Sequence, residues 1–392
     1  MDRLTIPESE HRERASRLLD TAHADGYDGV VLFDALNVHY ASGLYHLPTE
    51  RPTVLVVSDE GTEAVVPRLE KEHAERRDFA IDDVNVYFEY PQGEPMRLVA
   101  EVCERLGVAS GRLAADADGS PARNGYEGPA LSGVVDAEVG VEDYVTDMRE
   151  TKSAAEIDLI REASVWANLG HRLLQNAIEP GRRPVTVASE VESEGTRAML
   201  DTLGDRYEMM DWASPMTCKF TTGDVTARPH SVDQTTRISE GDNVVTVVKP
   251  HVGGYTTELE RTMFVGDPSD DQRHYFEIMR ESQEIAIDAI GPGVPYASVE
   301  EAVVDYYEEQ GVAEYTQHHI GHNIGMEGHE RPFLDVDYEG EIRPGELYTV
   351  EPGFYIPGIG GFRHSDTVLV TDEGTESLTY YPRDLESLVV DV

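Results

Sequence analysis

The chain has 392 residues and a formal net charge of −44 at pH 7, because 76 acidic residues face only 32 basic ones. This length suits two domains better than one small core. Nucleic-acid binding is disfavoured, since no basic stripe would neutralise phosphates. The two cysteines, Cys103 and Cys218, provide neither a disulfide framework nor a paired metal motif.

The acidic residues are spread along the chain, and only four of the basic residues are lysines. Dispersed charge of this size is typical of a protein that works in concentrated salt, where screening limits self-repulsion. We therefore expect a haloarchaeal-type cytoplasmic protein, with a cation-binding protein or one with a basic partner as the alternative. No apolar run is long enough to span a bilayer, so membrane association is not expected.

The first domain, placed at residues 1–150, is predicted to begin with a helix. Residues 8–25 have helical spacing of apolar positions, residues 29–33 form an apolar run of strand length, and residues 52–57 repeat that pattern. This alternation predicts an α/β domain.

The second domain, placed at residues 151–392, is predicted to open with another helix. Ser153 and Glu156 form a capping-box pattern ahead of a long periodic segment. Two more long helices are expected over residues 184–203 and 268–291. The segments rich in β-formers are 215–230, 243–265 and 346–371. The pattern predicts an α+β domain whose sheet carries its helices on one face.

Histidines are concentrated in residues 318–330, where four of them are threaded with glycines, and Glu351 follows in a segment rich in β-formers. Such a density is hard to explain as core packing, because each imidazole needs polar partners and glycine lets the backbone approach a ligand. The segment is therefore predicted to belong to an active site.

These motifs resemble the catalytic domain shared by methionine aminopeptidase, aminopeptidase P, prolidase and creatinase, the pita-bread hydrolases. The Gly-His-x-x-Gly run at 321–325, with His329 seven residues after His322, carries the resemblance. Residues 37–40 and 49–52 resemble the amino-terminal domain of creatinase, prolidase and aminopeptidase P. The resemblance implies a C–N hydrolase with an α+β pita-bread catalytic domain preceded by an α/β creatinase-type domain.

In the metallopeptidases of this family two Asp, one His and two Glu hold a pair of divalent ions. The resemblance places at these positions Val247, Glu258, His322, Glu351 and Ser365. Valine has no lone pair, and serine is a poor substitute for a bridging carboxylate, so no dinuclear site and no cofactor are expected. If one ion binds (Mn, Co or Zn), Glu258, His322 and Glu351 are the expected ligands.

Creatinase, the metal-free relative, resembles the chain at residues 253–264. By that resemblance His230 is the general base and acid, Glu260 and Glu351 hold the cationic end of the substrate, and His322 assists. The remaining substrate-binding candidates are Arg51, Glu258, His318, His329 and Arg363. Arg51 matches a creatinase arginine that reaches the neighbouring subunit's site, so the resemblance implies a homodimer in which both domains contribute to the site.

The residues themselves also predict an acidic pocket. Glu258 and Glu260 lie two positions apart and would face the same side of a strand. A pair of like charges at ~4 Å costs about 4 kcal/mol at an effective dielectric of 20. A proton, a metal or a cationic substrate could offset that cost, and His230 and His322 could carry protons near neutral pH.

Plainer roles stay open. The two glutamates could be an exposed acidic pair, His230 a structural residue, His318 and His329 groups that order the pocket, Arg363 a salt-bridge residue and Arg51 a surface arginine. The leading hypothesis is a creatinase-like hydrolase of a C–N bond in a small cationic or zwitterionic substrate. The first alternative is an Xaa-Pro dipeptidase or aminopeptidase with a single metal, and the second is a non-catalytic binding protein on the same scaffold.

Overall fold

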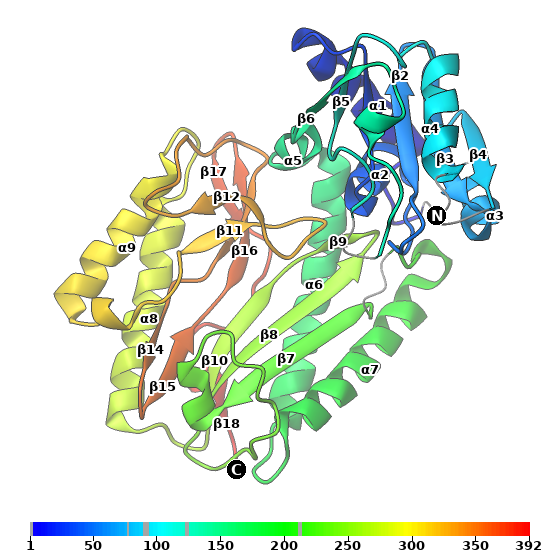
Figure 1. The fold of residues 1–392 in the computed structure, drawn as a ribbon. Coiled ribbons are helices and arrows are strands. Elements are labelled where there is room, and N and C mark those ends of the chain that lie inside the picture. The colour runs from blue at the N-terminus through cyan, green and yellow to red at the C-terminus, as the bar shows by residue number, and fades with distance from the viewer. Residues whose placement is uncertain (1–2, 77, 89–93, 122–124, 211–213) are drawn as a thin grey trace. The chain divides into compact units, whose positions relative to one another are not determined.

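The computed structural model describes residues 3–76, 78–88, 94–121, 125–210 and 214–392, and the chain divides into two compact units (Figure 1). The amino-terminal unit is Ile6–Arg149, and the carboxyl-terminal unit is Glu150–Val392 together with residues 1–5. No helix in these described stretches combines the length and the apolarity that crossing a membrane requires.

The amino-terminal unit is a mixed six-stranded sheet with strand order β4-β3-β2-β1-β5-β6. Its strands are β1 (Gly29–Leu32), β2 (Val54–Ser58), β3 (Gly61–Pro67), β4 (Asp83–Tyr87), β5 (Arg112–Ala115) and β6 (Glu138–Val141). Its helices are α1 (Glu8–Ala24), α2 (Ala35–Ser42), α3 (Lys71–Ala74), α4 (Glu94–Arg105) and α5 (Tyr144–Arg149). The central strands β1 and β2 are buried along their whole length, which explains their continuous runs of valine and leucine.

The carboxyl-terminal unit contains two larger sheets, with orders β18-β10-β8-β7 and β12-β11-β13-β16-β17, and the two-stranded sheet β14-β15. Its helices are α6 (Ala154–Ala177), α7 (Pro184–Leu203), α8 (Asp270–Ala289) and α9 (Tyr296–Gln310). The strands of the first sheet are β7 (Met216–Thr222), β8 (Asn243–Val252), β9 (Tyr255–Thr256), β10 (Leu259–Val265) and β18 (Val389–Val390). The other strands are β11 (Gly321–Asn323), β12 (Glu330–Leu334), β13 (Leu347–Val350), β14 (Gly353–Ile356), β15 (Gly360–Arg363), β16 (Asp366–Thr371) and β17 (Gly374–Ser377).

Helices cover both sheets of this unit. Helices α6 and α7 run along β8 and β7, and α8 and α9 lie beside the second sheet (Figure 1). Helix α6 begins with the predicted capping box, in which Ser153 accepts a hydrogen bond from the Glu156 N–H and the Glu156 carboxylate accepts one from the Ser153 N–H. Helix α9 was not among the predicted helices, although its buried residues Tyr296, Val299, Val303 and Tyr307 have helical spacing. The predicted β segment at 215–230 ends at Thr222 and continues as a 3-10 turn.

Two hydrogen bonds join the first sheet to the segment between β15 and β16. The backbones of Glu260 and Ser365 donate to each other over 3.0 Å and 3.1 Å. In the first sheet, Glu260 of β10 lies opposite Val247 of β8 in an antiparallel register. These pairings bring Val247 and Ser365, which are far apart in the sequence, to either side of Glu260.

Candidate active site

A cavity of about 460 Å³ lies in the carboxyl-terminal unit, between the first sheet and the histidine-rich segment. Strands β7, β8 and β10 supply one wall, and the other includes His318, His319, His329, Glu351 and Arg363. A volume of this size suits a small ligand such as a dipeptide.

Three carboxylates line this cavity, and all three are buried. Glu258 is the residue just before β10, and Glu260 is the second residue of that strand. Glu351 is the residue that directly follows β13. The strand alternation that predicted a common face for Glu258 and Glu260 agrees with their places in the cavity wall. Glu351 is brought to them by the packing of the second sheet.

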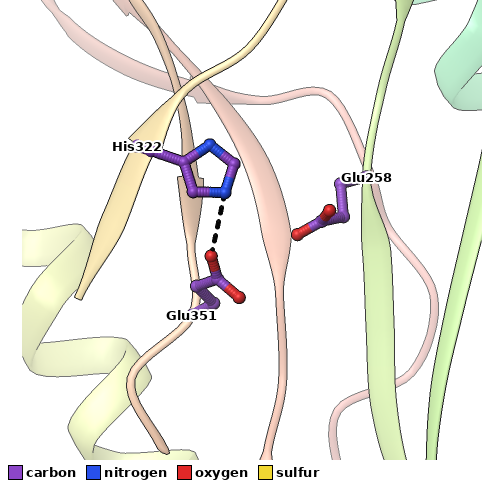
Figure 2. Close-up of side chains that lie close together, drawn as sticks. All are labelled: Glu258, His322 and Glu351. Atoms are coloured by element: carbon purple, nitrogen blue, oxygen red, sulfur yellow. Dashed lines mark ion pairs between the residues drawn. The ribbon is translucent and has the colours of Figure 1, made fainter. Parts of the chain in front are cut away.

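His322 lies beside Glu351, with its Nε2 atom 3.0 Å from Glu351 Oε1 (Figure 2). Its other ring nitrogen, Nδ1, is 2.9 Å from the carbonyl oxygen of Asn323. Because a carbonyl can only accept, Nδ1 carries the hydrogen, which leaves Nε2 directed to the carboxylates. Nε2 is buried and has no aligned hydrogen-bond partner within the described ranges, so the imidazole and the carboxylate are close without satisfying each other.

Glu258, His322 and Glu351 form a set of possible metal ligands. One ligand atom from each lies within 4.8 Å of the others, and Figure 2 shows the Glu258 carboxylate facing the His322–Glu351 pair across a short gap. Two carboxylates and an imidazole with a free Nε2 fit a single divalent ion that keeps an open position.

A second ion does not fit. Val247 lines the cavity beside these residues but offers no lone pair. Ser365 is fully buried, and its hydroxyl donates to Glu258 Oε1 over 3.3 Å. Within the described part of the chain, the side chains at this site therefore provide a ligand set for one divalent ion and not for two.

Lys249 forms an ion pair with Glu258 through its Nζ and the Oε2 atom. The lysine stands two positions after Val247 on β8, so both side chains are on the cavity side. Burial alone would lower the pKa of Lys249, but the neighbouring carboxylates, Glu258 first, raise it above its ordinary value. The ammonium is therefore charged at neutral pH.

Arg363 holds Glu260 with both arms of its guanidinium, and its NH2 group lies 2.8 Å from Glu260 Oε1. Its NH1 group donates to the Tyr355 hydroxyl over 3.1 Å, and that hydroxyl lies 2.8 Å from His318 Nε2. These contacts hold the side chains of Glu260, Arg363 and His318 in position in the cavity wall. The Arg363 guanidinium is the counter-ion of the Glu260 carboxylate.

These pairs correct the expectation of bare negative charge in the pocket. Glu258 is paired with Lys249, Glu260 with Arg363, and Glu351 lies against His322. The repulsion between the carboxylates is thus offset by groups of the chain itself, without requiring a cationic substrate.

The pKa values of two of these carboxyl groups move in opposite directions. Burial and the neighbouring carboxylates raise the pKa of Glu260, and Arg363 opposes that rise. Burial would also raise the pKa of Glu351, but the close approach and charge of His322 lower it below its ordinary value. Burial would lower the pKa of His322, but the negative charges of Glu351 and Glu258 raise it above its ordinary value. Glu351 is therefore the more firmly ionised of the two carboxyl groups.

The other predicted histidines also lie in this cavity. His329 stacks on His322, with ring centroids 3.8 Å apart, and burial lowers its pKa to about 4. Burial also lowers the pKa of His318. His230 lines the cavity from the loop after β7, and its side chain is exposed to solvent. These placements are compatible with the predicted roles and leave the roles themselves as predictions.

Arg51 lies in the amino-terminal unit, where its guanidinium pairs with the adjacent Glu50. Its predicted contact with a substrate stays a prediction. The sequence analysis did not single out Lys249, which lines the cavity, or Tyr355, whose hydroxyl contacts Arg363 and His318. The alternation of β8 from Val247 could have indicated Lys249, whereas the role of Tyr355 depends on the pairing of β14 with β15.

Each of the two units matches the model of a known protein family. The profile of metallopeptidase family M24 matches residues 158–372, more than half of the chain, and that of the creatinase/prolidase N-terminal domain matches residues 14–137. The Xaa-Pro dipeptidase of Pyrococcus furiosus is 28% identical over 374 residues, which cover 95% of this chain and 99% of that protein.

Solved structures show the same likeness. The Xaa-Pro dipeptidase from Bacillus anthracis superposes with a TM-score of 0.83 at 26% identity, covering 97% of this chain and 99% of that one. The prolidase from Pyrococcus horikoshii OT3 gives a TM-score of 0.80 at 27% identity, covering 95% and 99%. The relatives thus favour the Xaa-Pro alternative over the creatinase-like hypothesis. The chain belongs to metallopeptidase family M24, with a pita-bread catalytic domain behind a creatinase-type amino-terminal domain, and it is a C–N hydrolase.

Proposed function

We propose that the protein hydrolyses the amide bond of a short peptide of the Xaa-Pro type, at a site that holds one divalent ion. The observation that carries this proposal is the trio of Glu258, His322 and Glu351, whose ligand atoms lie within 4.8 Å of one another. The Xaa-Pro dipeptidases among the relatives support the substrate class. The proposed ion is Mn, Co or Zn, since carboxylate and imidazole ligands suit all three.

The side chains of the cavity have distinct parts in this proposal. A bound ion would polarise the scissile carbonyl and lower the pKa of a water molecule. Asn323 fixes the His322 ring by accepting its Nδ1 hydrogen, which keeps Nε2 free as a ligand atom. His230 is exposed and lines the cavity, so it can exchange protons with solvent and protonate the leaving nitrogen. The pair of Glu260 and Arg363 holds the wall against which the substrate lies.

The remaining expectations belong to this proposal as well. We infer a homodimer in which Arg51 reaches the neighbouring subunit's site, and a protein adapted to concentrated salt in the cytoplasm. The extreme acidic balance supports the adaptation to salt.

The test is metal content and hydrolysis measured together. Protein purified in high salt is assayed for Mn, Co and Zn by mass spectrometry, and for hydrolysis of Met-Pro and Ala-Pro beside Met-Ala and Ala-Ala. We expect one ion per chain, preference for the proline peptides and loss of activity on chelation. Glu351→Gln should lose both the ion and the activity, whereas Glu341→Gln, at an exposed position, should keep both. Activity that survives complete removal of the metal would overturn the proposal.

A second candidate function is creatinase-like hydrolysis of a small cationic or zwitterionic substrate without a metal. The ion pair of Lys249 with Glu258, together with Val247 and Ser365 in the cavity, favours it. Turnover of creatine or another guanidino acid that resists chelation, without any hydrolysis of proline dipeptides, would select this candidate.

A further inference from the structure

Lys249 is a cavity residue to which neither the family resemblance nor the proposed mechanism gives a role. Its side chain is mostly buried, with 25% exposed, and its partner Glu258 is almost completely buried at 3%. The lysine is thus held inside the site and is part of its wall. The ammonium also lies 3.1 Å from where a Cβ atom at Gly328 would stand, so glycine at that position leaves room for it.

The strand geometry explains why the ammonium reaches Glu258. Strand β8 pairs with β10 so that Val248 lies opposite Leu259, and continuing this register places Lys249 beside Glu258. Val247, on the same face of β8, lies opposite Glu260. The long stem of lysine carries its charge from this strand to the carboxylate.

Of the two residues that cannot serve as strong ligands, Val247 and Ser365, the serine contacts the Glu258 carboxylate. Ser365 donates its hydroxyl to Glu258 Oε1, while Lys249 binds Glu258 Oε2. Val247 is the neighbour of Lys249 on the cavity side of β8. Both oxygens of Glu258 are therefore engaged by hydrogen-bond donors of the chain, whereas His322 Nε2 remains without an aligned partner among the described residues.

We propose that the Lys249 ammonium takes the place of a second divalent ion, so that the site combines one exchangeable metal with one built-in positive charge. Lys249 holds Glu258 in place when no metal is bound, and it competes with the metal for that carboxylate. The competition weakens metal binding, because a divalent ion must share Glu258 with a positive charge or displace it. This inference rests on the proposed single-ion site, but it concerns binding and not turnover.

The experiment compares Lys249→Met with Lys219→Met. Methionine keeps the length and apolar character of the stem and removes the charge. Lys219 is a matched control, because it lines the same cavity from β7 and its side chain is exposed. Affinity for Mn and Co is measured by isothermal titration calorimetry on the full chain, after chelation and in high salt. Thermal unfolding of the same samples is followed in the presence of chelator.

We expect Lys249→Met to bind one ion roughly tenfold more tightly than the wild type, because a repulsive charge has been removed from the ligand set. In chelator its unfolding midpoint should fall by several degrees, since Glu258 is left buried without its counter-ion. Lys219→Met should match the wild type in both measurements. The double variant Lys249→Met with Glu258→Gln should recover the midpoint and lose the gain in affinity.

Metal affinity of Lys249→Met that equals or falls below that of the wild type would overturn the inference, as would undetectable binding by this variant. An unchanged midpoint in chelator would show that the ion pair does not hold Glu258, with the same consequence. These outcomes are separate from failure of the proposed function. A wild type that binds metal and cleaves no proline peptide would refute the proposed substrate while leaving the role of Lys249 intact.

Discussion

At the scale of single residues, the bidentate contact of Arg363 with Glu260 is a largely buried ion pair of the cavity, since their side chains are only 11% and 4% exposed. Removing one partner from a buried pair leaves an uncompensated charge. We predict that Arg363→Met lowers the free energy of unfolding by about 3 kcal/mol or more, measured by denaturant titration in high salt. Adding Glu260→Gln should recover a large part of that loss, and a double variant no more stable than the single one would contradict this account.

Sequence reasoning predicted which of these side chains lie close together better than it described their charges. His322, Glu351 and Glu258 lie in the motifs from which the site was predicted, and one ligand atom of each lies within 4.8 Å of the others. The compensation by Lys249 was not foreseen, because it depends on the register of β8 against β10 and not on spacing along the chain. β8 and β10 are near each other in the sequence, but which of their residues lie opposite each other is set by the register of the two strands, which the spacing along either strand does not specify.

At the scale of secondary-structure elements, the capping box of α6 is the clearest local signal. The Ser153 hydroxyl accepts the N–H of Glu156, which satisfies one of the free donors at the start of the helix. We predict that Ser153→Ala lowers the free energy of unfolding by about 1 kcal/mol. Ser189 is exposed inside α7 and offers a matched control, because serine to alanine within a helix should be neutral or stabilising. Equal effects of the two substitutions would contradict a capping role.

The elements that were predicted well are those with strong local signals. Helix α1 runs from Glu8 to Ala24 where helical spacing was seen over residues 8–25, and α7 occupies the predicted 184–203. Helix α9 was missed because its sequence is rich in valine and tyrosine, which favour strands by propensity. Its burial against the second sheet outweighs that preference.

Buried histidines should make the amino-terminal unit sensitive to acid. Burial lowers the pKa of His11 and His46 to about 4 and that of His39 to about 3. Below pH 6.5 these histidines are protonated in the unfolded chain, whereas in the folded unit they stay neutral until near pH 4. The free energy of unfolding therefore falls as the pH is lowered through that window. Each such imidazole contributes a slope of about 1.4 kcal/mol per pH unit.

The measurement is thermal unfolding of the full chain between pH 7 and pH 4.5 at constant salt, with hydrogen exchange in α1 and α2 as the local readout. We predict that His39→Gln makes the loss of stability with falling pH less steep. His23, which is exposed at the end of α1, is the control, and His23→Gln should leave the slope unchanged. A slope that is the same in both variants would exclude the buried imidazole as its source.

At the scale of the whole molecule, a net charge of −44 on 392 residues makes self-repulsion a major term in stability. Screening shortens the reach of charge from about 10 Å in 0.1 M salt to about 3 Å in 1 M salt. Buried pairs such as Arg261 with Asp366, 2.9 Å apart and almost completely shielded, are little affected by this screening. Added salt should therefore remove repulsion across the surface while leaving the pairs that hold the interior.

We predict that the unfolding midpoint rises by several degrees between about 0.1 M and 1 M KCl and then levels off. The rise should stop because above 1 M the repulsion between surface charges already has a very short range. Sucrose at matched osmolality is the control, because it strengthens burial without screening charge. A rise of the same size in sucrose would assign the effect to solvent exclusion, and a midpoint that falls with KCl would show that surface ion pairs outweigh the excess of negative charge. The predicted result requires the excess acidic residues to act as repelling charges in the folded protein, which is the physical reason for expecting it to work in concentrated salt.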